Sequence, residues 1–84
     1  MNTTPEEVER SRIVKVILKK LDKKKDPLRC VLFLIESQDK ETLLELKREL
    51  WCRSLNRSGC VLVRYCGGLK KVNMLLGGMG VSPG

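Results

Sequence analysis

The most regular pattern in the chain is the spacing of apolar residues over its first quarter. From Val8 to Leu21 they recur every three or four positions, and charged residues occupy most positions between them. This period predicts an amphipathic helix of about five turns. Thr4 ahead of Pro5, with Glu7 at the third helical position, is typical of a helix start. We therefore expect a helix that begins at Pro5 and ends within the run of lysines after Leu21.

The next segment, residues 30–35, is an unbroken apolar run whose periodicity fits both a helix and a strand. Asp26 followed by Pro27 favours a short helix over about residues 27–37. Val, Phe and Ile within a six-residue run instead favour a strand that is buried on both faces. The sequence leaves both alternatives open.

A polar break over residues 37–39 precedes a third segment. Asp39 can cap a helix over about residues 40–55. Apolar side chains at helical spacing share one side of this helix: Leu43, Leu46, Leu50 and Trp51. We interpret Trp51 as a residue of the hydrophobic core.

After Gly59 the pattern changes to one that favours strands. Residues 60–65 read Cys-Val-Leu-Val-Arg-Tyr, Gly67 and Gly68 can supply a flexible turn, and residues 69–76 can return as a second strand. These features predict a β-hairpin. The tail over residues 77–84 contains four glycines and a proline, so we expect one small domain over residues 1–76 and a flexible tail after it.

Charge is distributed unevenly along the chain, whose formal net charge is +7. Residues 19–29 contain six bases against two acids, whereas residues 30–52 contain three bases against five acids. From residue 53 onward the chain has no acid and five bases: Arg53, Arg57, Arg64, Lys70 and Lys71. Two basic zones that flank an acidic centre are typical of a surface that binds a polyanion, although a well-solvated lysine-rich face gives the same pattern.

Catalytic and metal-binding patterns are weak in this sequence. It has no histidine, and no cysteine has a base at a recognisable spacing, so we predict that the protein is not an enzyme and has no small-molecule substrate. We predict no metal and no cofactor, because the cysteines lack the paired spacing of a zinc site. We interpret them as free thiols in the apolar core: Cys30, Cys52, Cys60 and Cys66.

Neither a membrane span nor an export signal is recognisable. No stretch approaches the roughly 20 apolar residues that cross a bilayer, and the N-terminal residues lack a basic region followed by an apolar one. We therefore expect no membrane association and a cytoplasmic or otherwise intracellular location.

The order of these elements resembles a winged helix-turn-helix domain, as in small transcriptional regulators. Residues 54–61, Ser-Leu-Asn-Arg-Ser-Gly-Cys-Val, leading into residues 63–72 look like the junction and wing of that family. The resemblance covers residues 11–76 and requires residues 30–35 to lie in the second helix. It implies an α+β fold of three helices plus a C-terminal β-hairpin, with residues 40–55 as the recognition helix.

This resemblance implies a nucleic-acid-binding protein, a regulator of transcription that binds double-stranded DNA as a homodimer. The basic wing would contact phosphates. We predict contact residues on the third helix, at the junction and on the wing: Lys47, Arg48, Arg53, Arg57, Arg64, Lys70 and Lys71. Non-specific backbone contacts are expected from Lys23, Lys24 and Lys25.

Two alternatives remain at this point. With residues 30–35 as a strand, the order becomes helix-strand-helix-hairpin with a three-stranded sheet, which is typical of small interaction or RNA-binding α/β modules. Residues 40–55 also carry glutamates at four-residue spacing, Glu41, Glu45 and Glu49. This acidic stripe favours a protein-interaction or dimerisation module that uses the third helix or the hairpin edge.

Overall fold

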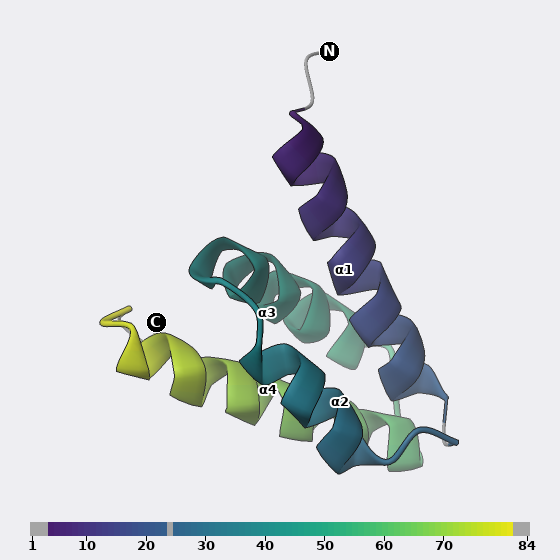
Figure 1. The fold of residues 1–84 in the computed structure, drawn as a ribbon. Helices are drawn as coiled ribbons and strands as arrows, with labels where there is room; N and C mark the ends of the chain where they lie inside the picture. The colour runs from purple at the N-terminus through teal and green to yellow at the C-terminus, as the bar shows by residue number, and fades with distance from the viewer. Residues whose placement is uncertain (1–3, 24, 82–84) are drawn as a thin grey trace.

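A computed structural model describes residues 4–23 and 25–81 of the chain. These residues form four helices, α1 (Pro5–Asp22), α2 (Leu28–Glu36), α3 (Lys40–Ser54) and α4 (Gly59–Gly78), and contain no strand. Figure 1 shows α2 crossing α4, with α1 along one side of the bundle and α3 behind. The domain is therefore all-α, and the predicted α+β fold is wrong.

The starts of α1 and α3 confirm the sequence prediction. The Thr4 hydroxyl accepts a hydrogen bond from the Glu7 amide at 3.2 Å, and the Asp39 carboxylate accepts one from the Thr42 amide at 3.0 Å. Each bond satisfies one of the amides that lack a partner in the first helical turn. The Thr42 bonds also hold the pKa of Asp39 below its ordinary value.

The ambiguous segment at residues 30–35 is helical, because it lies within α2. Pro27 stands at the N-cap of this helix, and the side chains of Val31 and Ile35 are buried at helical spacing. The alternative with a central strand and a three-stranded sheet is therefore wrong.

One hydrophobic core joins all four helices, and α4 packs against each of the other three. In α4 the buried positions recur every three or four residues: Tyr65, Gly68, Val72 and Leu76. This is the period of a helix with one buried face. The predicted β-hairpin over residues 60–76, and with it the wing of a winged helix-turn-helix domain, is wrong.

The glycine pair that suggested a hairpin turn has a packing role inside α4. A Cβ atom at Gly67 would lie 3.2 Å from Leu28 Cδ2, and one at Gly68 would lie 3.4 Å from Leu21 Cδ1 and 3.6 Å from Leu50 Cδ1. The missing side chains allow α4 to approach α1, α2 and α3 closely. Close approach compensates for the low helix propensity of two adjacent glycines.

The C-terminal end of α4 extends beyond the expected domain boundary at residue 76. Gly80 adopts a φ of 84°, and the Val81 amide donates to the Leu76 carbonyl at 2.9 Å. This arrangement is a glycine C-cap, and it packs Val81 against the core. The tail predicted for residues 77–84 thus begins inside α4, and its last residues, 82–84, lie outside the described part of the chain.

Two predictions about core residues are wrong. All four cysteines are exposed free thiols, and the side chain of Trp51 is exposed rather than buried.

Across residues 4–23 and 25–81, no helix combines the length and hydrophobicity that crossing a membrane requires.

Candidate nucleic-acid interface

The two basic zones of the sequence meet where α1 ends and α4 begins. The Arg64 guanidinium donates to the carbonyl of Leu21 from Nε at 2.7 Å and to the carbonyl of Lys20 from Nη2 at 2.8 Å. The last carbonyls of a helix have no partner within the helix. Arg64 satisfies two of them and places its positive charge at the negative end of the α1 dipole.

Asp22, the last residue of α1, is the second link between these zones. Its carboxylate accepts a hydrogen bond from the Tyr65 hydroxyl at 2.6 Å and lies 3.8 Å from Arg57 Nε. The Arg57 guanidinium also lies 6.0 Å from the centre of the Tyr65 ring. Burial, together with the bond to Asp22, raises the pKa of the Tyr65 hydroxyl above its ordinary value. Tyr65 is therefore neutral and structural.

We call this region the basic end, and it lies at the lower right of Figure 1. It has six cations, Lys19, Lys20, Lys23, Lys25, Arg57 and Arg64, against two acids, Asp22 and Asp26. Of these six cations, all except Lys20 and Arg64 are exposed. Lys24, another predicted contact, lies outside the described residues. The basic end therefore has a net charge of +4 from the residues described.

The remaining predicted contacts do not join the basic end. Arg53 pairs with Glu49 at 3.3 Å, and Lys71 Nζ pairs with Glu36 at 2.6 Å. Lys47 is half-buried on α3, Arg48 is exposed on the same helix, and Lys70 is exposed on α4. No wing exists in the described residues. The three contacts predicted for the wing lie on α4 instead: Arg64, Lys70 and Lys71.

Lys19 and Lys20 belong to the basic end, although neither is among the contact residues predicted from the sequence. A signal was present, since these residues open the zone over 19–29 in which bases outnumber acids. That zone lies next to Arg57 and Arg64 because α4 packs against α1, and no local sequence pattern predicts this packing.

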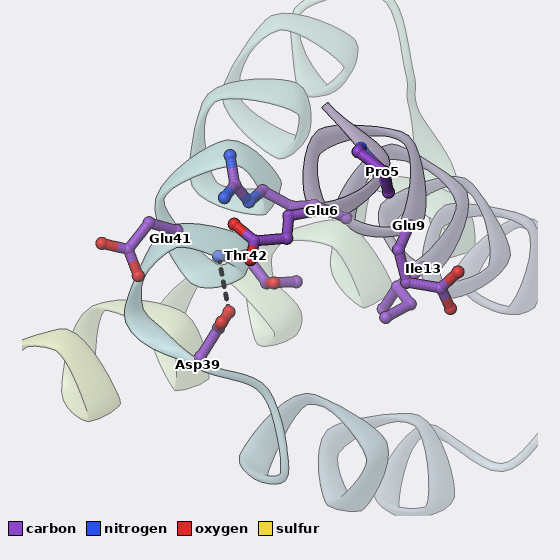
Figure 2. A pocket seen from close by; sticks show the side chains of 8 residues that line it. Pro5, Glu6, Glu9, Ile13, Asp39, Glu41 and Thr42 are labelled. Carbon is purple, nitrogen blue, oxygen red and sulfur yellow. Dashed lines mark hydrogen bonds between the residues drawn. The ribbon is translucent and has the colours of Figure 1, made fainter. Parts of the chain in front are cut away.

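The opposite end of α1 is acidic. An open hollow of about 700 Å³ lies between the first turns of α1 and α3, and its lining includes Glu6, Glu9, Asp39 and Glu41 with a single base, Arg10. Figure 2 shows Glu9 and Glu41 at opposite edges of the hollow, with their carboxylates pointing apart. In the part of the chain that the structure describes, no three potential ligand side chains are grouped to hold a metal ion.

Along α1, Glu9 at the acidic hollow and Lys19 at the basic end are ten residues apart, a separation of about 15 Å. This separation exceeds the Debye length of about 8 Å at physiological salt. A polyanion at the basic end is therefore screened from the acidic hollow.

Scans of the chain against protein-family models, curated proteins and solved structures found no match.

Proposed function

We propose that the protein binds double-stranded nucleic acid through phosphate contacts made by the basic end. The observation that supports this most directly is the pair of hydrogen bonds from Arg64 to the carbonyls of Lys20 and Leu21. These bonds link Arg64 to Lys20 and Leu21, which lie 44 and 43 positions earlier in the sequence, and so bring cations of the two zones to one surface.

One of the two acids of the basic end, Asp22, already has partners there. Asp22 is already engaged by the Tyr65 hydroxyl and Arg57, so it does not compete for the exposed lysines. Lysine is suited to contact with a phosphate backbone, because its long side chain and point charge adapt to phosphates without fixed geometry.

The composition of the basic end favours contact with the backbone over contact with bases. Its one aromatic residue, Tyr65, is buried and donates its hydroxyl to Asp22, so no ring is available to stack on an unpaired base. We therefore expect binding with little sequence preference, in which a duplex is recognised by its closely spaced phosphates. A role in transcription, expected from the sequence, stays a prediction.

Salt dependence gives this proposal a magnitude. Contact with about four phosphates predicts a slope near −4 for the logarithm of the binding constant against the logarithm of salt concentration. Affinity should then fall roughly 10²-fold between about 50 and 200 mM salt.

The experiment is a fluorescence anisotropy titration of labelled duplex DNA, single-stranded DNA and duplex RNA at both salt concentrations. The test variant combines Lys19→Ala, Lys23→Ala and Lys25→Ala, which all change exposed side chains of the basic end. A matched control combines Arg12→Ala, Lys40→Ala and Lys70→Ala, which remove the same charge from exposed positions elsewhere.

We expect the test variant to bind a duplex more than about tenfold more weakly than the control. Equal losses in the two variants would mean that overall charge, rather than the basic end, drives binding. Absence of binding to all three nucleic acids at low salt would overturn the proposed function.

A further inference from the structure

The outward face of α3 carries large side chains that the bundle does not cover. Trp51 is 61% exposed, Leu55 at the C-cap is 71% exposed and Leu44 is 37% exposed. Arg48, also exposed, lies between them on the same face. At 100° per residue the four positions fall within an arc of about 60°, so they form one narrow stripe along the helix. We call it the α3 stripe.

The spacing of the α3 stripe is symmetric. Leu44 and Leu55 are equally distant from the midpoint between residues 49 and 50, and so are Arg48 and Trp51. A two-fold axis through that midpoint therefore places Leu44 opposite Leu55 of a second copy, and Arg48 opposite Trp51 of that copy. Interfaces of this kind, in which the same patch is used on both subunits, are the commonest in homo-oligomers.

We propose that the chain forms an antiparallel homodimer through the α3 stripe. Each copy contributes a Leu44 and a Leu55 to two apolar contacts at the ends of the stripe. At its centre, each Arg48 guanidinium lies over the Trp51 ring of the other copy, a cation–π arrangement in which tryptophan is the best aromatic partner. Tryptophan and arginine are also the residues most enriched at the centres of protein interfaces.

A second copy fits this stripe better than an unrelated acidic partner. A two-fold arrangement gives both the arginine and the tryptophan a complementary residue, because each copy supplies the partner that the other lacks. The Cα atoms of the two Arg48 residues would lie about 10 Å apart, from an axial offset of three residues and a helix separation of about 9 Å. Their repulsion is screened at moderate salt.

The expected dimer is weak, because four side chains per copy bury well under the roughly 1,200 Å² of a stable interface. We expect a dissociation constant on the order of 0.1 mM. Association should be unchanged or strengthened as salt rises, since salt screens the repulsion between two copies of charge +7. This response is opposite to that of phosphate binding, so the two proposals succeed or fail independently.

The test is sedimentation velocity of the full chain, with a reducing agent present, up to protein concentrations of about 1 mM. Trp51→Arg places an arginine opposite Arg48 and should abolish the dimer. The double variant Arg48→Trp with Trp51→Arg exchanges the two residues and restores each opposing pair, so it should dimerise again. Phe33→Ala is the matched control, since Phe33 is 76% exposed on α2. Circular dichroism of each variant verifies folding.

A dimer that Trp51→Arg removes and the exchange variant restores supports a two-fold interface through Arg48 and Trp51 of the α3 stripe. Three results would overturn the proposal: a wild-type chain that is monomeric at every concentration, a dimer that Phe33→Ala disrupts and Trp51→Arg leaves intact, or an exchange variant that folds and stays monomeric.

Discussion

Arg64 links α1 to α4, and we predict that its loss lowers the stability of the domain. Its guanidinium closes the C-terminal end of α1 through hydrogen bonds to Lys20 and Leu21, and Arg64→Ala removes both bonds at once. No other hydrogen bond in the described residues links α1 to α4 except that between Tyr65 and Asp22. We expect Arg64→Ala to destabilise the whole domain rather than only the end of α1.

The magnitude follows from the two bonds. A hydrogen bond from a charged group contributes about 1.5–3 kcal/mol. Because Arg64 is half-buried, water replaces part of that loss in the variant, and we expect a total of about 2–3 kcal/mol. The stability of an 84-residue domain is roughly 4–13 kcal/mol, so the loss is a large fraction of the whole. The melting temperature should fall by roughly 8–24 °C.

Urea unfolding followed by circular dichroism measures this loss, with Lys70→Ala as a control on the exposed side of the same helix. The control should change stability by less than about 0.5 kcal/mol. Arg64→Lys should recover only part of the loss, because an ammonium cannot reproduce the planar fork that reaches two carbonyls. An Arg64→Ala variant as stable as the Lys70→Ala control would refute the capping role.

Two further predictions concern α4. Gly68→Val adds side-chain atoms where Leu21 and Leu50 would already lie 3.4 and 3.6 Å from a Cβ, so it should lower the free energy of unfolding in urea by about 1–3 kcal/mol. Gly77→Ala, with open space at that Cβ, should raise the free energy of unfolding by up to about 1 kcal/mol. The reverse order of stability would contradict the packing role of Gly68. The raised pKa of Tyr65 means that the unfolded chain loses its tyrosine proton first, so the stability advantage of wild type over Tyr65→Phe is fully present below about pH 10 and should shrink as pH rises above it. An advantage that is constant between pH 8 and 11 would contradict a structural hydrogen bond to Asp22.

The parts of the fold that the sequence predicts well are those with local chemistry at their ends. Thr4 and Asp39 cap α1 and α3 with side-chain oxygens that need only the next three residues. The segment over residues 30–35 has no such signal, because its apolar run fits two periods equally, and packing under α4 selects the helix.

The error in α4 has a specific physical cause. Residues 60–65 are rich in residue types that favour strands, and Gly67 and Gly68 are typical of a turn, so local propensity points away from a helix. The contacts that favour the helix are distant in sequence: Leu28 against Gly67, and Leu21 and Leu50 against Gly68. Tertiary packing overrides propensity here, and a single sequence carries no trace of those distances.

The same packing divides the positive charge of the basic end between two roles. Arg57 and Arg64 hold α1 to the start of α4 through Asp22 and the helix carbonyls, whereas Lys19, Lys23 and Lys25 are exposed. Loss of an arginine therefore lowers stability and disturbs the surface together, so reduced nucleic-acid binding in such a variant does not identify a contact. Loss of an exposed lysine removes charge and leaves the packing intact. The lysine variants, compared with a control of equal charge, are thus the ones that separate recognition from folding.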